Sequence, residues 1–299
     1  STPSDYASAE AMKALRLGLS VMLFSDNIAL ADEVALKRYA SEHDLIVMGP
    51  DCGTAIVNGV PLGFANSVRR GEIGVVGASG TGLQQVTCLV DRLGKGISQA
   101  IGTGGHDLHR DVGGISMLQG LQALAADPAT RLIVLISKPP AKDVAERILS
   151  AAGKAGKPVV VNFLGADPKT IARPNIYPAK TLEDAATEAV ALLDGKPPSR
   201  VTQPRGVAEH KLANGQRFIR GLYSGGTFCF EATMLVAEAL SPVSSNTPVG
   251  SAVPLENVWR SNGHTLLDLG DDVFTRGRPH PMIDHRLRNE RILAEAADP

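Results

Sequence analysis

Two turns of small and hydroxyl residues stand where an apolar run changes into helix-forming sequence. The first lies in IGVVGASGTGLQQ (residues 73–85) and comprises Ser79, Gly80, Thr81 and Gly82. A helix that begins there leaves backbone N–H groups unpaired at its N-terminus, where the helix dipole also favours an anion. An ordinary helix cap, made by the serine or threonine hydroxyl, is the competing interpretation.

An internal repeat favours the anion site, at least in the first copy. GASGTGLQQVTCLV (77–90) is echoed by LYSGGTFCFEATMLV (222–236), which places Ser224, Gly225, Gly226 and Thr227 at the matching point. Residues 100–128 and 268–299 also match, and both end in AADP. Only in the first copy does a strand-like run, RLIVLIS, follow. We therefore expect a duplicated α/β domain whose last copy is incomplete and whose sheet edge something else covers, in a fragment or in one chain of an assembly.

A polar, glycine-rich segment, GTGGHDLHRDVGG (102–114), carries a second set of candidate residues. These are Gly104, Gly105, His106 and Asp107, followed by His109 and Arg110. The segment follows a strand-like run, and ligands of open α/β sheets bind at the carboxyl ends of strands. The histidines could pair with a substrate carboxylate or act as acid–base groups, and a solvated loop histidine fits equally well. The spacing predicts no metal site.

An arginine-rich stretch, LGDDVFTRGRPHPMIDHRLRN (269–289), holds the third set. Its candidate residues are Arg276, Arg278 and His280, with two prolines around the histidine. Guanidinium groups in this number indicate either a site for carboxylate or phosphate or an ion-paired subunit interface. The rigid prolines suit a site, and a structural corner fits them nearly as well.

Short β-branched runs alternate with helix-like segments along most of the chain. Such alternation predicts an α/β protein with parallel sheets covered on both faces. The strand-like runs are SVMLFS, DLIVMG, IGVVGA, ISQAIG, RLIVLIS and PVVVNFL. Residues 196–218, rich in Pro, Gly and mixed charge, are the predicted linker.

The composition bounds the class of protein. With 299 residues, 43% hydrophobic residues and a net charge of -1, we expect about two domains and neither a nucleic-acid nor a membrane partner. Three scattered cysteines and the absence of a signal-like N-terminus predict a cytoplasmic protein. Cys52, which has no basic neighbour in sequence, is interpreted as a packed small residue.

Four motifs together identify a resemblance that covers essentially the whole chain. GPDCG, GASGTG, GTGGHDL and GRPHPMID closely resemble the FdrA proteins, which are relatives of the succinyl-CoA synthetase α subunit. The resemblance implies a partial Rossmann-like unit of CoA-binding type (1–55), a flavodoxin-like ligase-type domain (56–195), and an incomplete second flavodoxin-like domain (219–299). The CoA-binding glycine-rich turn would precede residue 1, so we expect CoA to bind poorly to this chain alone. The sequence predicts no other cofactor.

Two departures from this resemblance bear on function. The phosphorylated histidine of the ligases is expected soon after PVVVNFL, where this chain reads GADPKTIARPNIYPAKTLEDA without a histidine. The glutamate that orients that histidine falls, by the match to LIVLISKPPA, on Lys138. A lysine repels an imidazolium and attracts phosphate or carboxylate instead. Both changes argue against a phosphohistidine relay.

Three functional hypotheses follow. The FdrA resemblance implies an acyl-phosphate-using subunit, most directly one that exchanges oxalurate and phosphate with oxamate and carbamoyl phosphate in allantoin catabolism. The alternatives are a nucleotide-dependent acyl-CoA synthetase and a scaffold subunit without activity. In each enzymatic case the ligand is a small anion, such as phosphate, carbamoyl phosphate, oxamate or an acyl phosphate. The protein would work within a homo- or hetero-oligomer.

Overall fold

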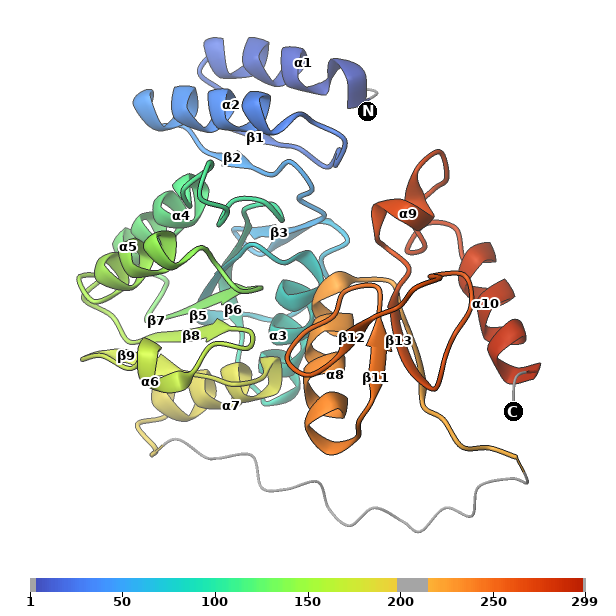
Figure 1. Cartoon of the computed structure of the whole chain (residues 1–299). Coiled ribbons are helices and arrows are strands. Elements are labelled where there is room, and N and C mark those ends of the chain that lie inside the picture. The colour runs from blue at the N-terminus through green and yellow to red at the C-terminus, as the bar shows by residue number, and fades with distance from the viewer. Residues whose placement is uncertain (1–3, 198–214, 298–299) are drawn as a thin grey trace. The chain divides into compact units, whose positions relative to one another are not determined.

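The structure, a computed structural model, describes residues 4–197 and 215–297 (Figure 1). The chain divides between Val201 and Thr202 into two compact units. This division lies within the predicted linker 196–218, most of which falls outside the described residues. The predicted domains 1–55 and 56–195 both belong to the first unit, and 219–299 belongs to the second.

The first unit begins with a small α/β layer. It comprises α1 (Ser4–Arg16), β1 (Val21–Met22), α2 (Leu30–Glu42) and β2 (Val47–Met48). β1 and β2 pair in parallel, and α1 packs on α2 (Figure 1). Leu15, Leu36 and Val47 are buried together between these elements. The two sequence runs predicted as strands here therefore contribute only two paired residues each.

The larger sheet of this unit has seven strands within the described residues, in the order β4-β3-β6-β5-β7-β8-β9. They are β3 (Thr54–Val57), β4 (Val60–Gly63), β5 (Arg70–Gly77), β6 (Ile97–Gly102), β7 (Leu132–Ser137), β8 (Val159–Phe163) and β9 (Ile176–Pro178). β3 and β4 form an antiparallel hairpin, whereas β5 to β9 are parallel. The predicted α/β class with parallel sheets is confirmed.

The five parallel strands follow the flavodoxin order. Numbered along the chain from β5, they read 2-1-3-4-5 across the sheet. The direction in which successive strands are added to the sheet therefore reverses between β5 and β7. Ligands of such sheets bind outside the carboxyl ends of the strands at this switch point. Ser79 follows β5 and Lys138 follows β7, so the topology brings these two candidate residues to the same edge.

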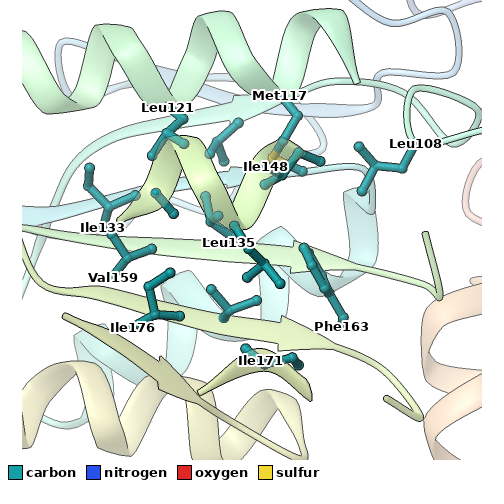
Figure 2. Close-up of a cluster of buried hydrophobic side chains, with 14 of the residues drawn as sticks. Leu108, Met117, Leu121, Ile133, Leu135, Ile148, Val159, Phe163, Ile171 and Ile176 are labelled. Atoms are coloured by element: carbon teal, nitrogen blue, oxygen red, sulfur yellow. The ribbon is translucent and has the colours of Figure 1, made fainter. Parts of the chain in front are cut away.

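Helices cover both faces of the larger sheet. They are α3 (Gly80–Arg92), α4 (Ile115–Ala126), α5 (Lys142–Ala152), α6 (Pro168–Ile171) and α7 (Leu182–Leu193). α3 packs against α7 on one face, and α4 against α5 on the other (Figure 1). Figure 2 shows the core on the α4–α5 side, where Ile133, Leu135 and Val159 of the strands meet Met117, Leu121 and Ile148 of the helices. β7 is buried along its whole length, as its unbroken apolar sequence predicts.

The second unit is a smaller α/β layer. Its elements are β10 (Arg220–Tyr223), α8 (Gly226–Ala239), β11 (Val243–Ser245), β12 (Val253–Pro254), β13 (His264–Asp268), α9 (Asp272–Thr275) and α10 (Arg286–Ala297). Within the described residues the parallel strands lie in the order β10-β13-β11-β12. The predicted repeat is visible in the pairing, since β10 and β13 pair in parallel as β5 and β6 do. None of the helices in the described ranges is long and apolar enough to cross a membrane.

Candidate functional site

The turn after β5 is a capped helix start. Ser79 is extended (φ -158°, ψ 105°), and its Oγ accepts a hydrogen bond from the N–H of Gly82 at 2.9 Å. A Cβ at position 82 would lie 2.6 Å from that Oγ, so the cap requires a glycine there. The capping interpretation thus accounts for the Ser79 side chain. The N–H groups of Gly80 and Thr81 donate to no backbone carbonyl within the described residues, and an anion site at these two groups stays a prediction.

Lys138 lies at the same edge of the sheet, directly after β7. Its side chain is exposed, and it forms no hydrogen bond or ion pair within the described residues. Its ammonium group is therefore not engaged by a carboxylate of the described chain. A role in attracting an anion stays a prediction.

The glycines after β6 are required by chain packing. Gly104 has φ +90°, and a Cβ on it would lie 2.1 Å from the carbonyl oxygen of Pro50. A Cβ on Gly105 would lie 3.0 Å from Oδ2 of Asp51. The turn after β2 (49–53) and the loop after β6 (102–105) therefore interlock. Gly104 and Gly105, named as candidate substrate-binding residues, are thus explained by the packing of the protein's own chain.

Asp107 is a buried structural residue. Its Oδ1 accepts hydrogen bonds from the Lys37 ammonium at 2.8 Å and from the Ser116 N–H at 3.2 Å, and its Oδ2 accepts from the Met117 N–H at 2.9 Å. The latter two donors lie in the first turn of α4, whose N-cap, Gly114, has no side chain to offer. The carboxylate that we predicted to act on a substrate is instead used to cap α4 and is 0% exposed.

Lys37 is the residue that sequence reasoning missed. Its side chain is fully buried, and its three donors reach Glu33 Oε1, Asp107 Oδ1 and the Thr103 carbonyl oxygen, each at 2.8 Å. The available signal was the spacing of Glu33 and Lys37, which is that of a helical ion pair. Such pairs are usually exposed, so the spacing alone does not indicate a buried charge cluster.

His106 lies beside this cluster. Its Nδ1 is 3.6 Å from Glu33 Oε2, and its ring centroid is 5.0 Å from that of His109. Interaction with the Glu33 carboxylate raises the pKa of His106, against the opposing effect of partial burial. Burial alone would raise the pKa of Glu33, but contacts with His106 and Lys37 hold it below its usual range. The imidazole, for which the sequence left an acid–base role open beside two alternatives, therefore has a charged carboxylate next to it.

The matching turn in the second unit differs in detail. α8 has Gly225 at its N-cap and no side-chain cap. Ser224 is half-buried and Thr227 is 3% exposed. The helix start that we predicted as a second anion site is thus present, without the hydroxyl cap of the first copy.

The arginine-rich loop of the second unit separates its predicted residues. Arg276 and Arg278 are exposed, and the Arg278 guanidinium lies 5.8 Å from the centroid of Trp259. Neither arginine forms an ion pair with a carboxylate of the described chain. His280 is half-buried, and a Cβ on Gly270 would lie 2.7 Å from its Nε2. The histidine therefore faces the start of its own loop, while the two guanidinium groups are exposed.

Cys52 has the packed role expected from the sequence. It is 2% exposed, its Sγ donates to the Gly102 carbonyl oxygen at 3.4 Å, and burial raises its pKa to about 11. Within the described residues, no group of three or more His, Cys, Asp or Glu residues could hold a metal ion.

Comparisons with known proteins give the chain a family context. The CoA binding domain model matches residues 68–165, which span β5 to β8, and the CoA-ligase model matches residues 222–299. Among curated proteins, the uncharacterized protein YahF of Escherichia coli is 46% identical over 98% of this chain and 58% of its own length. The mitochondrial succinate–CoA ligase subunit alpha-2 of Trichomonas vaginalis is 31% identical over 55% of this chain and 54% of its own length. The chain is thus similar to succinate–CoA ligase α subunits. It spans little more than half the length of these relatives.

Solved structures agree on the fold. A dinucleotide-forming acetyl-coenzyme A synthetase of Ca. Korarchaeum cryptofilum matches with a TM-score of 0.51 and 18% identity, over 80% of this chain and 53% of that one. An ATP citrate lyase of Methanothrix soehngenii matches with a TM-score of 0.52 and 17% identity, over 72% and 44%. The predicted relationship to the succinyl-CoA synthetase α subunit is confirmed, while the FdrA name stays a prediction. The similar curated proteins and the CoA-ligase model support the acyl-CoA ligase hypothesis and give carbamoyl transfer in allantoin catabolism no support.

Proposed function

We propose that this chain is the α-subunit-like part of an acyl-CoA ligase, in which an acyl group passes between phosphate and the thiol of CoA. The observation that carries the proposal is that the CoA-binding and CoA-ligase matches fall on the two strand–turn–helix copies, residues 68–165 and 222–299. The flavodoxin strand order adds a location, since α3 begins at the switch point of the larger sheet.

The chemistry of this transfer needs fixed positive charge more than a covalent nucleophile. The sulfur of CoA attacks the carbonyl carbon of an acyl phosphate, the bond from that carbon to the phosphate oxygen breaks, and phosphate leaves with the electron pair. Donors that hold the phosphate stabilise the charge that develops on it. The N–H groups of Gly80 and Thr81 and the ammonium of Lys138 are the proposed donors.

Residues 164–181 contain no histidine, and Lys138 replaces the expected glutamate. The proposal therefore includes no phosphohistidine at this place. The same two observations favour carbamoyl phosphate, itself an acyl phosphate, as the second candidate substrate. Its use would need neither CoA nor nucleotide, which makes the two candidates separable by experiment.

The test is the half-reaction of acyl-CoA with phosphate, carried out by the protein with its natural subunits and without nucleotide. We expect the thioester absorbance to fall when phosphate is added, and we expect this with members of a panel of short acyl-CoAs. Phosphate release from carbamoyl phosphate that depends on oxamate, with no thioester loss, would instead support the second candidate. If neither reaction occurs, the scaffold hypothesis replaces both.

One substitution tests where the phosphate binds. Gly80 has an ordinary backbone conformation, and a Cβ there meets only Thr54 Oγ1 at 3.5 Å, so Gly80→Asp is sterically tolerated. The added carboxylate suits the helix dipole but repels an anion at the same point, and we expect the KM for phosphate to rise about tenfold, or ~1.4 kcal/mol. Gly80→Asn is the neutral control of equal size. Equal kinetics for the two variants would place the phosphate elsewhere.

A further inference from the structure

A carboxylate and an imidazole form a dyad at the carboxyl edge of the larger sheet. Glu33 comes from α2 and His106 from the loop after β6, and Nδ1 of the ring lies 3.6 Å from Oε2 of the carboxylate. The Glu33 side chain is 1% exposed, whereas that of His106 is 53% exposed. The ring therefore has one nitrogen directed at a buried anion, and the side chain as a whole is open to solvent. Since a carboxylate partner fixes which ring nitrogen keeps its proton, Nε2 is left as the nitrogen that exchanges one.

The carboxylate is fixed in charge and position. Glu33 Oε1 accepts from Lys37, whose other two donors go to Asp107 and the Thr103 carbonyl oxygen. Glu33 and Asp107 carry two negative charges against the single positive charge of Lys37, so a proton on His106 makes this group neutral. Asp51 adds a further negative charge near the ring, and His109 is the other titratable neighbour. These neighbouring charges thus stabilise the protonated ring of His106 but do not require the ring to stay protonated.

The loop that carries His106 starts at the same end of the sheet as the proposed phosphate position. Gly77 at the end of β5 pairs with Gly102 at the end of β6, and the Thr103 N–H donates to the Gly77 carbonyl oxygen at 2.9 Å. The loop that carries His106 therefore starts next to the turn that leads into α3. An acyl phosphate bound at that turn has its carbonyl carbon near the same edge, where an attacking thiol must approach.

We propose that His106 is the general base of acyl transfer and that Glu33 is its positioning residue. Nε2 takes the proton from the CoA thiol as sulfur attacks the acyl carbonyl carbon. The bond to phosphate then breaks, phosphate leaves with the electron pair, and the imidazolium releases its proton to the departing phosphate or to water. This inference rests on the proposed function.

The effect of pH follows from the charges around the ring. The neutral imidazole is the base, so the rate of thiol attack rises with pH through the pKa of His106. Glu33 raises this pKa above the usual value of about 6.5 for histidine. Glu33→Gln keeps an oxygen for Lys37 but removes the negative charge, and the rising limb should therefore move to lower pH. A residue with a purely structural role would not shift the limb.

The experiment compares His106→Asn with His109→Asn, its exposed neighbour in the same loop. For acyl transfer from an acyl phosphate to CoA, the direction in which Nε2 takes the thiol proton, we expect kcat to fall about 10²–10⁴-fold in His106→Asn and to stay near wild type in His109→Asn. The rising limb of the pH profile should disappear only in the first variant. Free imidazole should restore part of the rate to His106→Gly, a test that leaves Lys37, Glu33 and Asp107 themselves unchanged.

The outcomes separate the two proposals. An active wild-type protein whose His106 and His109 variants behave alike, or whose His106→Gly variant gains nothing from imidazole, overturns the inference and leaves the proposed function standing. A wild-type protein without acyl transfer activity overturns both.

Discussion

The two copies of the strand–turn–helix repeat share their order of elements but not their surroundings. In the first copy, β5 lies between β6 and β7, and α3 begins with a serine cap. In the second copy, β10 pairs with β13 at the end of the strand order, and α8 begins at Gly225 without a side-chain cap. The repeat therefore predicts topology well, whereas capping and burial depend on single residues and on what packs beside them.

The charges near the two copies differ in the same way. The first unit holds a fully buried lysine with two carboxylates, and the second holds Arg220, Arg291 and Glu295 at 8–12% side-chain exposure. Within the described residues, no second lysine or arginine pairs with Glu33 or Asp107, whereas Glu295 pairs with two arginines. This difference can be tested directly.

Removing the Lys37 ammonium should have the largest effect. Lys37→Met removes the buried ammonium that both Glu33 and Asp107 contact, and we expect the free energy of unfolding to fall by about 3–5 kcal/mol. Arg291→Met leaves Arg220 paired with Glu295, so its loss should be clearly smaller. Urea unfolding measures both, with Lys13→Met in an exposed pair as the control. Equal losses for Lys37→Met and Arg291→Met would show that the two clusters do not differ as described.

Removing the Ser79 cap should have an intermediate effect. Ser79→Ala leaves the Gly82 N–H without its acceptor, and we expect a loss of about 1 kcal/mol in the free energy of unfolding. Thr181→Ala is the matched control, because Thr181 caps α7 beyond β9, three strands from β5. If both variants lose similar stability and only Ser79→Ala alters acyl transfer, the turn before α3 belongs to the acyl transfer site. Unchanged transfer in both would remove Ser79 from it.

Adding a cap to the second copy should have the smallest effect. Gly225 is extended (φ -162°, ψ 126°), a conformation that serine adopts freely. Gly225→Ser should therefore raise the stability of the second unit by a few tenths of a kcal/mol, as measured by thermal unfolding. A decrease would mean that the turn into α8 has no room for a hydroxyl, and the two helix starts would differ in packing as well as in capping.

The fold could be predicted further from the sequence than the site. Continuous apolar runs gave β5 to β8 because strands buried on both faces need them. The β3–β4 hairpin was not predicted, although Asn58 and Gly59 between two short apolar runs are a strong hairpin signal. β9, with three residues, is too short to show a pattern of its own.

The site depended on contacts between residues distant in sequence. Cys52 as a packed residue follows from local sequence and was predicted, whereas the Ser79 cap was the competing interpretation that the repeat led us to rank second. Asp107 was expected at a ligand because it lies in a polar, glycine-rich loop, yet it is buried because Lys37 lies 70 positions away and meets it there. No local pattern encodes such a pair, and a polar residue in a loop is exposed by default.

The interlocked turns at 49–53 and 102–105 make the small N-terminal layer inseparable from the larger sheet. Separating α2 from the larger sheet would move the Pro50 carbonyl away from Gly104. It would also expose Lys37 and the carboxylates of Glu33 and Asp107 to solvent. Separation at this point would expose these charges, so we expect amide protons of α2 and of β5 to exchange with solvent in one cooperative event. Residues 1–55 and 56–195, which look like separate domains in sequence, thus belong to one compact unit. His106 lies where these two stretches meet.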